Sequence, residues 1–125
     1  MRDHVLVKNE RRAVAAYSTN TKPAAGPEFG RFLRGAAAAL DWATGAVATA
    51  PVGPGTRPVD PDSIAAEIKL CDFLLAGTAS ALTVVRTDPH YVNGVEHALR
   101  WLLELESEPP VPLTDDAHPA AVSAA

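Results

Sequence analysis

The sequence predicts an all-α protein: a small bundle of three helices, or four if residues 8–17 form one, with proline-rich connections and a disordered C-terminal tail. Apolar residues recur at steps of three and four in three segments, which is the period of an amphipathic helix. Two of these segments open on Asp-Pro, an N-cap followed by the residue preferred at the first helical position. With 125 residues, the chain has room for one domain with a modest core.

The first strong helix is predicted from about residue 28 to about residue 48. Pro27 and Glu28 suit its first turn. Three glycines weaken it by roughly 1 kcal/mol each relative to alanine, and close approach of another helix would explain why they are tolerated. Trp42 lies about 220° round the helical wheel from Phe29, away from the apolar stripe, so we expect it to make a contact outside the core. The apolar stripe consists of Phe29, Phe32, Leu33, Ala36, Leu40, Ala43 and Val47, and the glycines are Gly30, Gly35 and Gly45.

The second and third helices are predicted from their caps. Asp60 and Pro61 open the second, which Gly77 closes. Asp88 and Pro89 open the third. Residues 78–86 are compatible with a further helical turn or with a short extended piece. The second stripe is Ile64, Ile68, Cys71, Leu74 and Leu75, and the third is Tyr91, Val95, Ala98, Leu99, Leu102 and Leu105.

The predicted organisation has three parts. Residues 1–27 form a basic N-terminal segment and linker, residues 28–106 the helical domain, and residues 107–125 a disordered tail rich in proline, alanine and acidic residues. Within the first part, we expect a short helix over 8–17 or a short strand at 5–7 ahead of it.

Charge is distributed unevenly. Residues 1–34 hold seven basic and three acidic side chains, a net charge of +4, whereas residues 35–125 hold four basic and twelve acidic ones, a net charge of −8. Such asymmetry can steer a partner or pair two copies head to tail. The chain lacks a signal-peptide pattern and a membrane-spanning stretch, and its single cysteine excludes an internal disulfide, so a cytoplasmic protein with no membrane partner is expected.

The side chains that could form a catalytic or metal-binding site are not predicted to lie close together. His90 and His97 lie seven residues apart, about 10 Å along a helix, and this spacing does not suit one metal ion. His97 and Arg100 share the face opposite the leucines, and Cys71 lies on an apolar stripe. The sequence therefore predicts no catalytic residue, no metal and no cofactor.

The function predicted is that of a small non-enzymatic interaction or oligomerisation protein, whose partner is a second copy or a larger protein. The candidate partner-binding residues are Trp42, Arg31, Arg34, His97 and Arg100. The alternative is a nucleic-acid-associated regulator, whose phosphate contacts would be Lys8, Arg11, Arg12, Arg31 and Arg34. A third hypothesis is a site completed across a dimer interface, with the residues Tyr91, His90, His97 and Arg100.

Overall fold

The computed structural model describes residues 1–53, 55–76 and 88–111, and for residues 18–27 it describes the backbone alone. This part of the chain is helical and contains no β-strand, which confirms the predicted all-α class. An isolated antiparallel bridge joins Thr49 to Thr56. The helices are α1 (His4–Ala43), α2 (Pro61–Leu75) and α3 (Pro89–Leu102).

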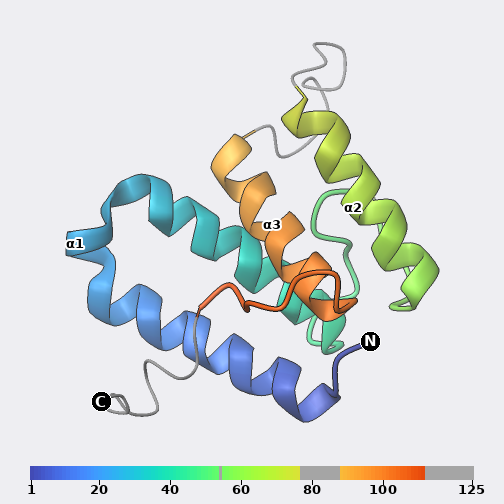
Figure 1. Ribbon diagram of the computed structural model, residues 1–125, viewed down its shortest axis with the longest axis horizontal. Coiled ribbons are helices and arrows are strands. Elements are labelled where there is room, and N and C mark those ends of the chain that lie inside the picture. The colour runs from blue at the N-terminus through green and yellow to red at the C-terminus, as the bar shows by residue number, and fades with distance from the viewer. Residues whose placement is uncertain (54, 77–87, 112–125) are drawn as a thin grey trace.

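The long helix α1 folds back on itself, so that its two halves lie as neighbouring arms (Figure 1). Arg11 and Asp41 are 30 residues apart, yet the Arg11 Nε atom lies 2.7 Å from Asp41 Oδ1. A straight helix would separate these residues by about 45 Å. We call residues 4–17 the N-terminal arm and residues 28–43 the C-terminal arm.

The bend lies in the segment that sequence analysis assigned to a linker. The backbone of residues 18–27 is helical, although the sequence there contains Pro23 and Pro27. Proline inside a helix removes an amide donor and kinks the helix. Beside the bend, the rings of Tyr17 and Phe29 meet edge to face with their centroids 5.5 Å apart. The expected separate N-terminal segment is thus one arm of α1.

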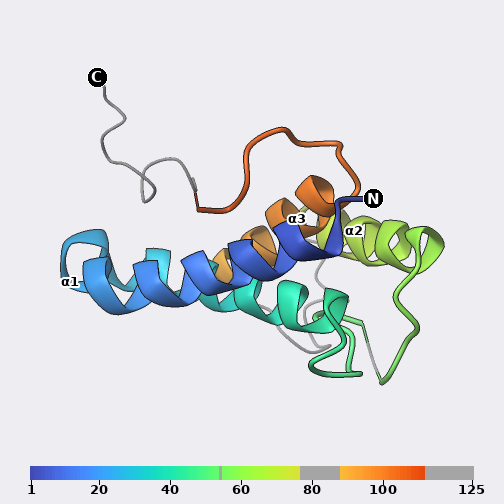
Figure 2. The same ribbon diagram turned by 90° about the horizontal axis from the view of Figure 1, so that it is seen from below.

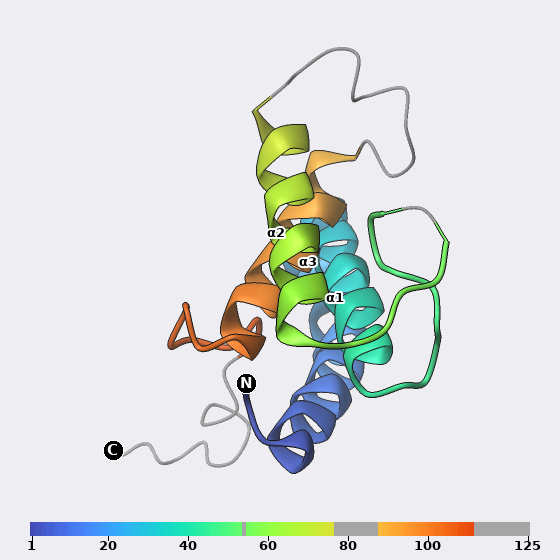
Figure 3. The same cartoon turned by 90° about the vertical axis from the view of Figure 1, so that its right-hand side faces the viewer.

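α3 lies at the centre and packs against both α1 and α2 (Figure 3). Its crossing with α1 brings two backbones into direct contact. A Cβ atom at Gly35 would overlap the main-chain carbonyl of Tyr91, and one at Gly94 would overlap that of Phe32. Close helix approach therefore explains Gly35, as predicted.

The other two glycines of the predicted first helix have different surroundings. A Cβ atom at Gly30 would meet no atom within 4 Å. Gly45 has a φ of 86°, a left-handed conformation that glycine adopts without strain, and it follows the C-cap Thr44. For this reason α1 ends at Ala43, and the predicted end at residue 48 is wrong.

Trp42 belongs to the core, with 0% of its surface exposed. Its Nε1–H group donates a hydrogen bond to the carbonyl oxygen of Arg57, at 3.1 Å. The wheel of an isolated helix placed Trp42 outside the apolar stripe, but the connection between α1 and α2 returns to this ring and bonds to it. Trp42 therefore offers no surface to a partner, which corrects the expectation of an outward contact.

The same connection is fastened to α2 by the buried carboxylate of Glu67. Glu67 Oε1 accepts hydrogen bonds from the amides of Val52 and Gly53, at 3.0 and 3.1 Å. Glu67 Oε2 accepts from Gly53 N and from the Arg57 guanidinium, at 3.1 and 3.3 Å. A Cβ atom at Gly53 would overlap Glu67 Oε2, so a larger residue here would displace the carboxylate from its present position.

The predicted starts of α2 and α3 are confirmed. Asp60 accepts a hydrogen bond from Ser63 N at 2.7 Å, and Asp88 accepts one from His90 N at 3.0 Å. Pro61 and Pro89 are the first helical residues. These side chains satisfy amide donors that have no partner within the first turn of a helix.

The ends of these two helices are less well matched to the sequence patterns. α3 ends at Leu102, and Leu105, assigned to its apolar stripe, is exposed. The predicted closure at Gly77 and the ambiguous segment 78–86 lie outside the described residues.

The N-terminus caps the end of α3. The Arg2 amide donates to Leu102 O at 2.8 Å, and the Arg2 side chain donates to the carbonyls of Trp101 and Glu106, at 2.7 and 2.9 Å. A cation beside the last carbonyls of a helix is favourable because those groups lack amide donors and carry partial negative charge. The neighbouring residues 5–7 lie in α1, so the alternative of a strand there is wrong.

Residues 103–111 cross from the end of α3 to the N-terminal arm (Figure 2). The Val111 amide donates to the buried carboxylate of Glu10 at 2.7 Å, and Pro110 and Val111 are buried. The first residues of the predicted tail are therefore packed, whereas residues 112–125 lie outside the described part.

Candidate interaction site

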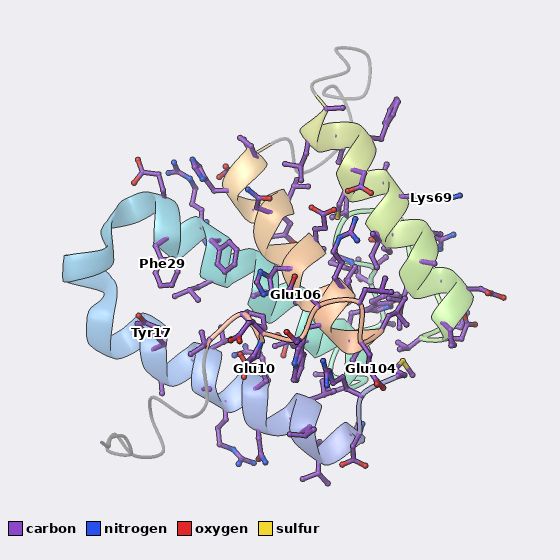
Figure 4. All side chains as sticks on the ribbon, in the orientation of Figure 1. Glu10, Tyr17, Phe29, Lys69, Glu104 and Glu106 are labelled. Carbon is purple, nitrogen blue, oxygen red and sulfur yellow. The ribbon has the colours of Figure 1, made fainter. Side chains whose placement is uncertain are left out.

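An open groove lies between the two arms of α1. Its volume is about 360 Å³. Tyr17 and Phe29 face each other across the space between the arms near the bend (Figure 4), and the Arg11–Asp41 ion pair joins the arms further from it. We call this cavity the α1 groove. Its lining residues are Arg11, Val14, Ala15, Phe29, Gly30, Leu33, Arg34 and Ala37.

The inner walls of the α1 groove are apolar. Val14 and Leu33 extend from opposite arms into the core and are almost completely buried. Ala15, Gly30 and Ala37 are small, so they leave the helix backbones accessible from outside. The apolar surface that the groove offers from outside is therefore that of Ala15, Phe29 and Ala37, which suits a groove that receives apolar side chains.

Two guanidinium groups lie at the α1 groove, and they differ in their partners. Arg11 forms a two-pronged ion pair with Asp41, with N–O distances of 2.7 and 3.3 Å, and its charge is therefore largely compensated. Arg34 is exposed, and its guanidinium has no hydrogen bond or ion pair with any residue that the structure describes. Within the described part of the chain, the positive charge of Arg34 at the rim of the groove is therefore not compensated.

The five predicted partner-binding residues are not brought together. Trp42 is buried, and Arg34 alone among the five lines the α1 groove. Arg31 forms an ion pair with Asp88, at 2.8 Å, that ties α1 to the first turn of α3. The remaining two, His97 and Arg100, have partners within the chain.

His97 and Arg100 were expected to face water or a partner. The His97 Nε2 atom lies 2.8 Å from the carbonyl oxygen of Glu108, and its ring meets Phe32 edge-on at 6.0 Å. Arg100 donates to Glu96 Oε2 at 3.1 Å and to Asp72 Oδ2 at 3.2 Å. Arg100 therefore connects α3 to α2.

The pKa values of the two carboxyl groups beside Arg100 are shifted in opposite directions. Burial raises the pKa of Glu96 above its ordinary value, and a hydrogen bond with Asp72 raises it further. The same hydrogen bond lowers the pKa of Asp72, as does the charge of Arg100. When Glu96 is protonated, its proton and the guanidinium of Arg100 therefore hold the two carboxyl groups together across the α2–α3 contact.

We expect Glu96→Gln to change the pH dependence of stability. Because the folded-state pKa of Glu96 is raised, its contribution to stability is complete below its unfolded value, near 4.5, and is lost as the pH rises through the folded value. Wild-type protein should therefore lose stability relative to Glu96→Gln as the pH rises from about 4.5. Urea unfolding from pH 4 to pH 8 measures this difference. Glu28→Gln is the control, because Glu28 is an exposed carboxylate on α1, and an equal effect in both variants would contradict the coupling.

Cys71 packs in the core, as predicted, with none of its surface exposed. Burial raises the pKa of its thiol far above the usual range, and the negative charges of Glu96, Glu67 and Asp72 raise it further. A thiolate nucleophile is therefore strongly disfavoured at this position. Among the described residues, no group of three or more histidine, cysteine or acidic side chains is placed to hold a metal ion.

Two buried carboxylates, Glu67 and Glu10, are not predicted as buried from the sequence, although both lie at helical spacing from apolar residues. Glu67 lies three residues after Ile64 on the apolar stripe of α2, and Glu10 lies between Val7 and Val14 on α1. A charged residue at helical spacing within a buried stripe indicates a paired or hydrogen-bonded group.

Comparisons with protein-family models, curated proteins and solved structures found no match to this chain. Within the residues that the structure covers, none of the helices is both long and apolar enough to cross a membrane.

Proposed function

We propose that this chain is a non-enzymatic interaction protein and that it binds a partner protein in the α1 groove. The observation that carries the proposal is that the groove between the arms has a partly apolar lining, small residues on both walls and, at its rim, an arginine without an anionic partner among the described residues. Apolar grooves between helices that carry a few polar groups are a common form of peptide-binding site.

Gly30 supports the same proposal. Glycine inside a helix costs about 1 kcal/mol relative to alanine, and no contact with the described residues requires glycine here, because a Cβ atom would meet none of their atoms within 4 Å. By contrast, Gly35 is required by the crossing with α3. Close approach of a partner at the groove would give Gly30 a role that its contacts with the described residues do not.

Photo-crosslinking from the groove tests the proposal. A benzoyl-phenylalanine at Ala15, which is exposed and lines the groove, should give discrete adducts with protein in the native host. The same residue at Lys69, which points away from the fold on α2 (Figure 4), is the control. Gly30→Trp, which fills the groove, should abolish the Ala15 adducts. Adducts from Lys69 but none from Ala15, or adducts insensitive to Gly30→Trp, would refute the proposal.

The nucleic-acid alternative has less support. Of its five proposed phosphate contacts, Arg11 is engaged by Asp41 and Arg31 by Asp88. Phosphate binding would require these cations to exchange carboxylate partners for phosphates. We therefore expect no gel shift with duplex or single-stranded nucleic acid at low salt, and a shift that weakens with added salt would favour the alternative.

A further inference from the structure

We propose that the partner segment bound in the α1 groove is an acidic amphipathic helix of another protein, with its apolar side chains against Ala15, Phe29 and Ala37 and a carboxylate on Arg34. This inference rests on the proposed function and adds the chemistry of the partner. It follows from the shape of the groove, from its walls and from its charge.

The shape favours a helix over an extended peptide. Both walls of the groove are helices, whose backbone amides and carbonyls are used within α1. An extended peptide gains affinity by adding to a strand edge, and helical walls offer no such edge. A helix laid between two helices instead interdigitates its side chains with theirs and completes a bundle.

The walls favour protein contacts. Small side chains at Ala15, Gly30 and Ala37 allow a third helix to approach the arms closely. The groove volume, about 360 Å³, is at the lower end of the range for ligand pockets. It therefore suits a few apolar anchor side chains of a helix that otherwise lies along the surface.

The charge favours an acidic partner. Arg34 at the rim has no anionic partner among the described residues, and residues 1–34 carry a net charge of +4. Lys8 and Arg12 add exposed cations on the N-terminal arm. Glutamate or aspartate residues beside the apolar stripe of the incoming helix would compensate these charges, and a basic helix would be repelled.

Two synthetic peptides test the inference with the full-length protein. Both are fluorescein-labelled 20-residue helices with the same leucine and alanine stripe, and their remaining positions are glutamate in one and lysine in the other. Fluorescence anisotropy should show the acidic peptide binding at least about ten-fold more tightly. Arg34→Glu should weaken the acidic peptide by about ten-fold, roughly 1.4 kcal/mol, and strengthen the basic one. Lys69→Glu makes the same change in net charge on α2 and should alter neither affinity by more than about two-fold.

The outcomes separate this inference from the proposed function. Equal binding of both peptides, abolished by Gly30→Trp, would overturn the acidic-partner inference and leave the groove as the interaction surface. Peptide binding that Gly30→Trp leaves intact would overturn both. A dimer in sedimentation that Gly30→Trp dissociates would identify a second copy as the occupant and would overturn the inference of a different partner protein.

Discussion

Gly94→Ala is expected to destabilise the protein by about 3 kcal/mol, at the upper end of the range for over-packing. The added Cβ atom would overlap the carbonyl oxygen of Phe32 and crowd the amide of Ala36. Both are backbone atoms of a packed helix and cannot move aside as a flexible side chain would. α1 and α3 would have to separate along the whole crossing, which would weaken the packing of Val95, Ala98 and Leu99.

Urea denaturation measures this change, with Gly30→Ala as the matched control. The substitution is the same, and both glycines lie inside a helix, Gly94 in α3 and Gly30 in α1. The Cβ atom added at Gly30, however, would meet no described atom within 4 Å. Gly30→Ala should therefore stabilise the protein, by up to about 1 kcal/mol from helix propensity. Similar stability changes of the same sign in both variants would show that α1 and α3 do not cross at Gly94.

Glu67→Ala should be comparably damaging, with a loss of about 3 kcal/mol. The substitution removes the acceptor for the buried amides of Val52 and Gly53 and the partner of Arg57. It also leaves a cavity where a fully buried side chain had been. Because the Arg57 carbonyl holds the Trp42 indole, loosening of this connection should expose Trp42.

Tryptophan fluorescence and urea unfolding report the two parts of this prediction. Glu67→Gln keeps one acceptor oxygen and most of the volume, so it should lose less stability, about 1–2 kcal/mol. A red shift of the emission in Glu67→Ala that is smaller in Glu67→Gln would agree with the proposed linkage. Wild-type stability in Glu67→Ala would mean that the connection is not anchored by this carboxylate.

The sequence predicts those features of the helices that are fixed by neighbouring residues, above all the first residues of α2 and α3. Asp60-Pro61 and Asp88-Pro89 act within four residues of the chain, and so the starts of α2 and α3 could be read without knowledge of the tertiary structure. The same holds for Cys71, whose burial follows from its position on the stripe of α2. Gly45 follows the end of α1 in a left-handed conformation, but the apolar periodicity continues past it to Val47, and the predicted helix end at residue 48 is therefore too late.

Long-range packing explains what the sequence patterns missed. Trp42 is buried by a connection that returns 15 residues later to bond to its ring, and a helical wheel contains no information on that return. Arg100 and Glu96 have the four-residue spacing of a helical ion pair, but Asp72 joins them from 28 residues away. The α1 groove exists only because α1 folds back, at a segment whose prolines indicated an interruption without indicating the direction of the chain beyond it.

The fold-back of α1 creates the groove, and it is tested directly by nuclear Overhauser effects between the aromatic rings of Tyr17 and Phe29. In the structure their centroids are 5.5 Å apart, whereas in a straight helix twelve residues would separate them by about 18 Å. A folded-back α1 predicts cross-peaks between the two rings, and these should vanish in Phe29→Leu. Assigned rings without such cross-peaks, in a protein that is otherwise folded, would contradict the hairpin of α1 and with it the groove on which the proposed function rests.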